Sequence, residues 1–139
     1  MQNKEDSVFY FSSRLSQRAK THSIFLHSHY YCFFRGDDLQ QYHSCTDYYR
    51  TQQFKLLGDE AAATKIHSLK FGDKIQSTAQ KLEEPLMRSE KWKMWEDSRV
   101  NIMRKAIKLK FEQNPRLLYK LIMTSDKKLI EDNPKDPFW

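Results

Sequence analysis

Residues 89–112 have the sequence SEKWKMWEDSRVNIMRKAIKLKFE, the longest stretch of the chain with helical periodicity. Its apolar positions fall mostly three or four residues apart: Trp92, Trp95, Ile102, Met103, Ala106, Ile107 and Phe111. Residues at this spacing share one face of an α-helix, and a folded domain buries that face. The stretch therefore predicts one long helix as the centre of a mainly helical domain.

Shorter helices are predicted on both sides of this stretch. Ser44-Cys45-Thr46-Asp47 has the Ser-x-x-acid pattern of a helix start, and Gly58 marks the end of that helix. Asp59 is a candidate cap for the next helix, and residues 74–81 form a weaker one. Asn114-Pro115 then gives a cap followed by proline at the first position of a last helix.

Strands are predicted towards both ends of the chain. Residues 8–11 are short and rich in strand-forming types, and residues 24–35 alternate in a way that favours a strand. A turn at 36–38 leads to a second hairpin arm at 39–42, and residues 128–131 form a closing strand. The expected fold class is therefore α+β, mainly helical, with a short N-terminal sheet in a single domain.

Length and composition agree with one intracellular domain. The chain has 139 residues, and its two cysteines are too few for a disulfide framework. No apolar run approaches the roughly 20 residues of a membrane span, and the N-terminus lacks a signal sequence. We therefore expect a cytoplasmic or nuclear protein with no membrane partner.

The charge of the chain favours ligands that carry phosphate. The formal net charge is +6, and lysines and arginines gather between Lys70 and Lys110. A basic face attracts nucleotides, ADP-ribose or nucleic acid. A solvated helix face explains the same pattern equally well.

Four segments, taken in order, carry a family resemblance. They are residues 42–55 (YHSCTDYYRTQQFK), Trp95-Glu96 at the long helix, residues 114–124, and the closing pair 129–131 and 136–139. Their order and spacing resemble the signatures of the NADAR family of YbiA-like N-glycosidases. The resemblance covers residues 34–139, while residues 1–33 match loosely as N-terminal strands and a loop of the same domain. Family members continue past the final tryptophan, so we expect a C-terminally short domain.

The resemblance implies cleavage of a ribose–nitrogen bond, in riboflavin-pathway intermediates or in ADP-ribosylated guanine. It gives catalytic importance to a glutamate in the first motif, a tryptophan and a closing aspartate. Here Trp95 and Asp136 match the last two, whereas Thr46 stands at the glutamate position and Asp47 at the next position, where the family has histidine. The catalytic candidates are thus Asp136, Asp47 and Thr46. The substrate-binding candidates are Trp95, Tyr48, Arg50, Gln52 and Trp139.

The reaction requires these residue types. Breaking the bond develops positive charge on the sugar, which a carboxylate stabilises while it orients or deprotonates water. Asp136 is suited to this role. Asp47 is rotated by roughly 100° from the glutamate position on a regular helix. The Trp95 indole is suited to stacking on a base, worth about 1–3 kcal/mol by analogy with nucleic-acid binding.

Each candidate also has a structural alternative. Asp47 is equally suited to capping its helix, Trp95 to the core, and Asp136 to the turn before Pro137. Arg50 is suited either to a phosphate or to an ion pair with Asp47. Five residues close in sequence offer metal-binding atoms, but their spacing is unlike that of zinc sites: His27, His29, Cys32, His43 and Cys45. We therefore expect no metal and no cofactor.

Three functions compete at this point. The first is an N-glycosidase acting on an ADP-ribose-like or nucleotide-like molecule, free or attached to nucleic acid. The second is a catalytically silent module that binds ADP-ribose or a nucleotide, because Thr46 replaces the expected glutamate. The third is a nucleic-acid-binding module that depends on net charge, which ranks last because the sequence has no reader motif.

Overall fold

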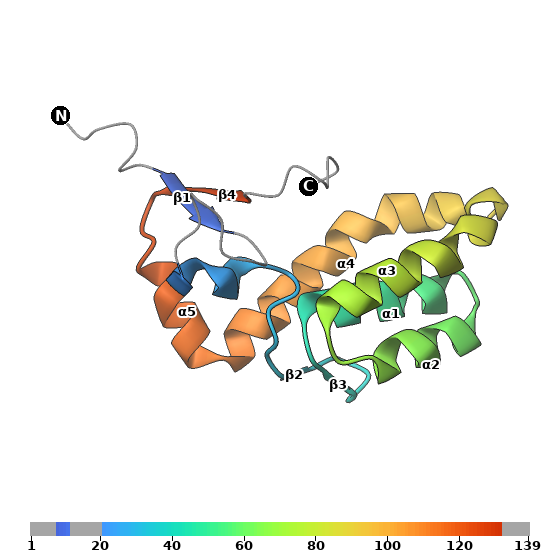
Figure 1. Ribbon diagram of the computed structural model, residues 1–139, viewed down its shortest axis with the longest axis horizontal. Coiled ribbons are helices and arrows are strands. Elements are labelled where there is room, and N and C mark those ends of the chain that lie inside the picture. Colours follow the sequence, from blue (N-terminus) through green and yellow to red (C-terminus); the bar gives the residue numbers. More distant parts are fainter. Residues whose placement is uncertain (1–7, 12–20, 132–139) are drawn as a thin grey trace.

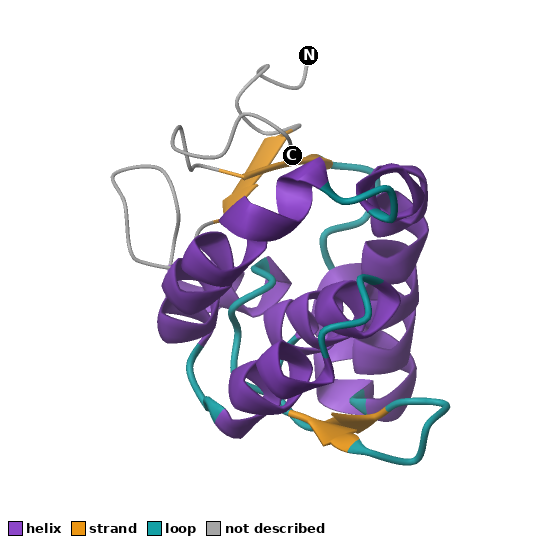
Figure 2. Cartoon of the chain, turned by 90° about the vertical axis from the view of Figure 1, so that its right-hand side faces the viewer, coloured by secondary structure: helices purple, strands orange, loops and turns teal. Residues whose placement is uncertain are grey.

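The computed structural model describes residues 8–11 and 21–131 of the chain. This part is α+β and mainly helical, as predicted, with short strands at its margins (Figures 1 and 2). The helices are α1 (Cys45–Leu56), α2 (Glu60–Ser68), α3 (Gly72–Glu83), α4 (Trp92–Gln113) and α5 (Pro115–Ile122), with 3₁₀ helices at Thr21–Leu26 and Glu84–Arg88. The strands are β1 (Val8–Phe11), β2 (Phe34–Arg35), β3 (Gln41–Tyr42) and β4 (Lys128–Glu131).

Helix α1 lies against α2, α3 and α4, so it is the common partner of these three helices. The Ser44 side chain caps it by accepting from the Asp47 backbone N–H at 3.1 Å. Gly58 follows the helix with φ +80°, a conformation that favours glycine. Asp59 then caps α2 through the Ala62 N–H. The predicted start and end of α1 and the predicted cap of α2 are therefore confirmed.

Helix α4 is the long predicted helix, and it connects the α1–α3 group with α5 (Figure 1). Trp95, Met103, Ala106 and Phe111 are buried in the core as the periodicity predicted. Ile107 is an exception, because it is exposed while Leu109 and Lys110 are buried. The face that packs inward is thus displaced near the C-terminal end, where α4 meets the segment before β2.

The strands form two small sheets that join distant parts of the chain. β1 pairs in parallel with β4, with Val8 opposite Lys128 and Phe11 opposite Glu131. β2 and β3 form the predicted hairpin, antiparallel, with Phe34 opposite Tyr42. Two-stranded sheets are marginal by themselves, so these strands depend on the helices they pack against.

The predicted strand at residues 24–35 is wrong for most of its length. Residues 21–26 form a 3₁₀ helix, turns follow, and only Phe34–Arg35 pair as a strand. The segment is held instead by contacts with helices: the Thr46 N–H donates to the Ser28 carbonyl, and Lys110 Nζ donates to the carbonyls of Phe25 and His27. Tertiary hydrogen bonds therefore replace the ladder that the alternating sequence suggested.

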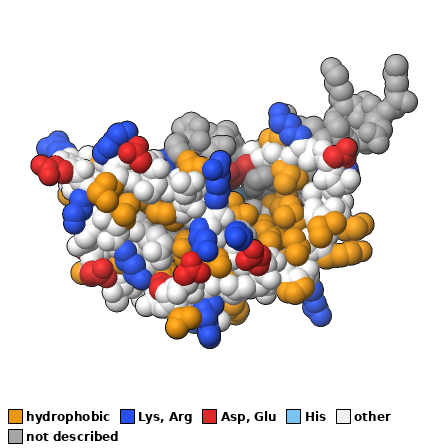
Figure 3. Space-filling view, turned by 180° about the vertical axis from the view of Figure 1, so that it is seen from behind, with side chains coloured by type: hydrophobic (Ala, Val, Ile, Leu, Met, Phe, Trp, Pro, Cys, Tyr) orange, Lys and Arg blue, Asp and Glu red, His pale blue; other side chains and the backbone are white. Residues whose placement is uncertain are grey.

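Exposed apolar side chains gather around α5. Leu118, Tyr119 and Ile122 are exposed on this helix and Met123 directly after it, on the half of the molecule where Figure 3 shows the largest area of hydrophobic side chains. Among the described residues, no helix is both long enough and apolar enough to span a bilayer.

Candidate histidine and carboxylate site at the start of helix α1

The first turn of α1 meets a histidine from the irregular segment before β2. His29 Nδ1 lies 2.6 Å from the Thr46 hydroxyl, which is 2% exposed. Thr46 stands two residues after the capping Ser44, where the partial positive charge of a helix N-terminus is felt. His29 is therefore the partly accessible member of this pair, and Thr46 is the buried one.

A second histidine joins this pair to the closing strand. The His29 backbone N–H donates to His27 Nδ1 at 3.0 Å, so the proton of a neutral His27 is on Nε2. His27 Nε2 lies 2.7 Å from Glu131 Oε1, at the end of β4. The two imidazole rings meet edge to face with centroids 4.6 Å apart. The start of α1 and the end of β4 are thus linked through His27 and His29.

Helix α3 closes the other side of His29. Asp73 Oδ1 lies 3.8 Å from His29 Nε2, and Asp73 is exposed. A Cβ atom at Gly72 would come within 2.6 Å of the His29 side chain, so only glycine fits here without a shift. Burial, and after it the electrostatic effect of the neighbouring His27, lowers the pKa of His29 to about 4. His29 is therefore neutral at pH 7 and able to accept a proton.

Asp47 faces the protein interior on the neighbouring side of α1. Its side chain is 0% exposed and accepts from the His43 backbone N–H at 3.0 Å and from Thr51 at 3.2 Å. His67 Nδ1 lies 3.1 Å from the same carboxylate. Burial raises the pKa of Asp47 above the usual range for aspartate. The structure thus places Asp47 among groups that fix the start of α1, as its capping alternative implied.

The polar candidates further along α1 point to two different regions. Arg50 pairs with Glu83 at 2.8 Å and also donates to Gln53 and Gln76, so it has no ion pair with Asp47. Gln52 donates to the Tyr42 hydroxyl at 3.0 Å. Tyr48 packs its ring against those of Tyr42 and Phe34. Gln52 and Tyr48 therefore lie with Tyr42, whereas Arg50 meets the side chains of α3.

Trp95 lies in the core. It is 1% exposed, and its ring packs at 4.9 Å from that of Tyr49 on α1. Asp136 and Trp139, the two candidates from the chain's closing motif, lie outside the described residues. The structure thus links Thr46 to the end of β4 through His29 and His27, while Trp95 packs in the core.

The sequence analysis weighed the histidines only as metal ligands and did not predict the contacts that they make here. Within residues 8–11 and 21–131, no group of three or more His, Cys, Asp or Glu is arranged to hold a metal ion. Cys32 and Cys45 are buried free thiols, and burial raises the pKa of Cys45 to about 12. His27 and His29 meet Glu131 and Asp73 instead, which lie about 100 and 44 residues further along the chain. The pattern His27-Ser28-His29 was the available signal, but it could not identify these partners.

Comparison with known proteins adds a family to this geometry. The NADAR domain family matches residues 2–139. The chain is 26% identical over 107 residues to N-glycosidase R617 of Acanthamoeba polyphaga mimivirus, covering 77% of this chain and 60% of that protein. It is 30% identical over 98 residues to the chloroplastic riboflavin biosynthesis protein PYRR of Zea mays, covering 66% and 15%. Over 47 residues it is 40% identical to N-glycosidase YbiA of Escherichia coli strain K12, covering 34% and 29%.

The matched region spans only part of each of these proteins. It covers 60% of the viral protein and less than a third of the other two. The whole relatives therefore contain sequence beyond the region that this chain resembles.

Proposed function

The chain belongs to the NADAR domain family, and from that membership we propose that it is an N-glycosidase that hydrolyses a ribose–nitrogen bond. The substrate class we assign is ADP-ribosylated guanine or an intermediate of riboflavin biosynthesis. The names of the relatives support the bond type and the riboflavin part of this range, because they include N-glycosidases and riboflavin biosynthesis proteins. The site we assign is the one between α1 and β4.

One observation carries the proposal: the histidine link between Thr46 and Glu131. Through this link, the Glu131 carboxylate at the end of β4 lies in the neighbourhood of Thr46, the position where the family resemblance implies glutamate. We assign to Glu131 the electrostatic role that a carboxylate at position 46 would have. Asp136, five residues further along the sequence, is the second carboxylate that we assign to the reaction.

The chemistry follows from these groups. As the bond between the anomeric carbon and nitrogen breaks, its electron pair leaves with the base, and positive charge develops on the sugar. A carboxylate stabilises that charge, and water attacks the anomeric carbon while it gives a proton to a carboxylate or to neutral His29. The departing base takes up a proton at its nitrogen. This proton is the one that water gave up, passed on by the carboxylate or His29, so the products are the sugar with a hydroxyl at the anomeric carbon and the neutral base, and atoms and charge balance.

Thr46 and Asp47 have supporting roles in this proposal. Thr46 is buried and holds the ring of His29, so it is a positioning residue. The Asp47 carboxylate accepts from the His43 N–H and contacts His67 Nδ1, and these contacts fix the first turn of α1. Both side chains are buried, Thr46 at 2% and Asp47 at 0% exposed, so each acts through the groups that it contacts.

The test is hydrolysis by the purified chain. ADP-ribosylated guanine nucleotides and ribosylated riboflavin intermediates are incubated with it, and released base and sugar are separated by chromatography. We expect turnover with one class, and a decrease in kcat of about 100-fold or more for Glu131→Gln and for Asp136→Asn. Glu90→Gln, a change at an exposed glutamate outside the site, should retain wild-type kcat. Absence of turnover with both classes, or equal rates for all variants, would contradict the proposal.

A second candidate function is a silent ADP-ribose-binding or nucleotide-binding module. The observation in its favour is that Thr46 offers no carboxylate and that Asp47, one residue further, is fully buried. Calorimetry with ADP-ribose separates the two functions: binding without hydrolysis of any tested substrate supports the silent module. In that case Thr46→Glu should gain measurable hydrolysis, because it restores an acid beside His29.

A further inference from the structure

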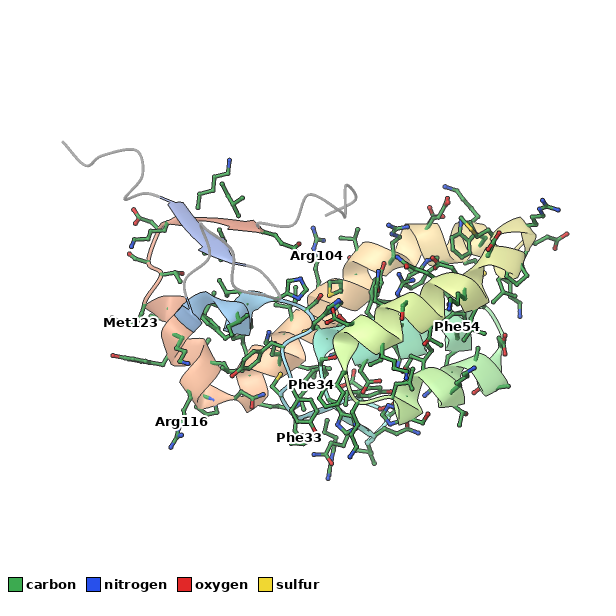
Figure 4. All side chains as sticks on the ribbon, viewed as in Figure 1. Phe33, Phe34, Phe54, Arg104, Arg116 and Met123 are labelled. Atoms are coloured by element: carbon green, nitrogen blue, oxygen red, sulfur yellow. The ribbon has the colours of Figure 1, made fainter. Side chains whose placement is uncertain are left out.

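Three exposed aromatic side chains form one surface beside the candidate site. Tyr31, Phe33 and Phe71 are 44%, 47% and 68% exposed. The Tyr31 ring lies 5.1 Å from that of Phe33 and 6.1 Å from that of Phe71, measured between centroids. Single exposed apolar residues are common, but a contiguous group of large rings marks a binding surface. We call Tyr31, Phe33, Phe71 and the underlying His43 the ring cluster; Phe33 is labelled in Figure 4.

Local folding does not explain why Phe71 is aromatic. Phe71 occupies the N-cap position of α3, where serine, threonine, aspartate or asparagine stabilise a helix by about 0.5–2 kcal/mol. Its side chain makes no capping hydrogen bond. The ring instead contacts Tyr31, which lies 40 positions earlier in the chain. The Phe71 side chain thus contributes to the aromatic surface and does not cap α3.

The ring cluster is built on a fixed support. Tyr31 stacks on His43 at 5.8 Å with an interplanar angle of 21°, and His43 stacks on His67 at 6.2 Å and 10°. The buried Asp47 carboxylate accepts from the His43 backbone N–H and contacts His67 Nδ1. Tyr31 is therefore the outer ring of a stacked column whose base is held by hydrogen bonds. A pre-organised surface loses little conformational entropy when another ring stacks on it.

One polar atom in the cluster is unsatisfied. His43 Nδ1 is buried and has no hydrogen-bond partner within the described part of the chain. Most buried polar atoms in proteins are hydrogen-bonded, so such an atom calls for a partner. Because the atom is buried beneath Tyr31, a ligand stacked on the outer face of that ring does not reach it.

Charges next to the cluster favour a phosphate-bearing ligand. Lys70 and Lys74 are exposed on either side of Phe71 in the sequence, and Arg35 is exposed two residues after Phe33. Asp73 is the acidic neighbour, and it faces His29. The excess of positive charge agrees with the net charge of +6.

We propose that the ring cluster is a nucleobase-stacking site for a phosphate-bearing nucleotide unit. Gly72, which follows Phe71, lies against His29, so the cluster adjoins the site at Thr46. A base on Tyr31 and Phe71 would therefore direct its sugar and phosphate towards His29 and the flanking lysines. The assignment of that sugar to a substrate rests on the proposed function, whereas the stacking itself does not.

The test compares ligands with and without a base. AMP, ribose 5-phosphate and a short single-stranded oligoadenylate are titrated into the full chain, with affinities from calorimetry and contacts from NMR. We expect nuclear Overhauser effects between the AMP base protons and the rings of Tyr31 and Phe71. Ribose 5-phosphate should bind about tenfold or more weakly than AMP, as expected for loss of one stacked base. If the oligonucleotide binds more tightly than AMP, the base that stacks on the cluster belongs to a nucleic-acid strand. If AMP binds more tightly, the base belongs to a free nucleotide.

Variants of single rings test whether AMP binds at the ring cluster. Tyr31→Ala and Phe71→Ala should each weaken AMP binding about tenfold, and Tyr31→Trp should retain it. Tyr119→Ala, at an exposed tyrosine on α5, is the matched control and should bind like the wild type. Undetectable AMP binding at millimolar concentration, or unchanged affinity in both alanine variants, would overturn the inference. If AMP binding depends on the rings but no substrate is hydrolysed, only the proposed function is refuted. If a substrate is hydrolysed and neither alanine change affects the rate, only the stacking site is refuted.

Discussion

His27 and His29 are two positions apart, yet their side chains have different partners. His27 Nδ1 accepts from a backbone N–H, and its Nε2 faces Glu131. His29 uses Nδ1 for the buried Thr46 hydroxyl, and its Nε2 lies near Asp73. Because each ring nitrogen has a defined neighbour, both imidazoles are fixed in orientation. Proton transfer requires donors and acceptors that are oriented in this way.

His29 gives a prediction about stability and pH. Its pKa in the folded state is about 4, below the 6.5 of an unperturbed histidine, so the unfolded state binds more protons between these values. The contribution of neutral His29 is therefore present above pH 6.5 and is lost as the pH falls towards 4. The groups that act on its charge are His27, Arg50, Asp73 and Glu131.

The measurement is urea unfolding at pH 7 and pH 4.5 for the wild type and for His29→Gln. We expect the wild type to lose about 2–3 kcal/mol more than the variant between these two pH values. The comparison cancels the titration of other groups, since both proteins contain them. Equal losses in the two proteins would show that His29 is not held in its neutral form by the fold.

At the scale of single elements, α1 and α3 determine how the site is shaped. The capping pattern at Ser44–Asp47 predicted α1, and the structure adds that the Asp47 carboxylate accepts from the N–H of His43 rather than from that of Ser44. The start of α3 was predicted only as a weak helix from residue 74. It begins at Gly72, whose lack of a side chain lets the helix approach His29.

Gly72→Ala tests this approach. The added Cβ would lie 2.6 Å from the His29 Cβ and Cγ and 2.9 Å from its backbone Cα, so the histidine segment or α3 must shift. We expect the free energy of unfolding to fall by about 1–3 kcal/mol, as for other overpacked sites, and the His29 ring signals to change in NMR spectra. Gln80→Ala, at an exposed position of the same helix, is the control and should have little effect. A variant with unchanged stability and unchanged His29 signals would show that the contact is not tight.

At the scale of the whole molecule, Lys110 joins helix α4 to the segment before β2. It is buried on α4, and its Nζ donates to the carbonyls of Phe25 at 2.5 Å and of His27 at 3.2 Å. Burial lowers the pKa of Lys110 below the usual lysine value. The ammonium also lies 5.4 Å from the ring centroid of Tyr30. This one side chain thus holds the segment that supplies both site histidines.

Lys110→Met keeps the length and apolar stem of the side chain but removes these donors. We expect the free energy of unfolding to decrease by about 1–3 kcal/mol, because a buried carbonyl loses its partner. Backbone hydrogen exchange at residues 25–30 should become faster. Lys108→Met, at an exposed position of the same helix, is the matched control. Equal stability and equal exchange in the two variants would exclude this role for Lys110.

Sequence patterns by themselves determined the α-helices, both ends of α1 and the start of α2. Local signals were sufficient there: apolar spacing for α4, Ser44 and Gly58 for the limits of α1, and Asp59 for the start of α2. They also indicated β1, β4 and the β2–β3 hairpin. The motif order indicated the family, because it depends on residue types and spacing alone.

Only the tertiary structure decided which groups meet at the site. Most of residues 24–35 form an irregular segment instead of the predicted strand, because the Thr46 N–H and the Lys110 ammonium group, both on helices, donate to its carbonyl groups. The same contacts bring His29 to Thr46 and His27 to Glu131, across 17 positions in one case and about 100 in the other. Local patterns do not contain such pairings, since their free energy comes from packing between segments that are distant in the chain.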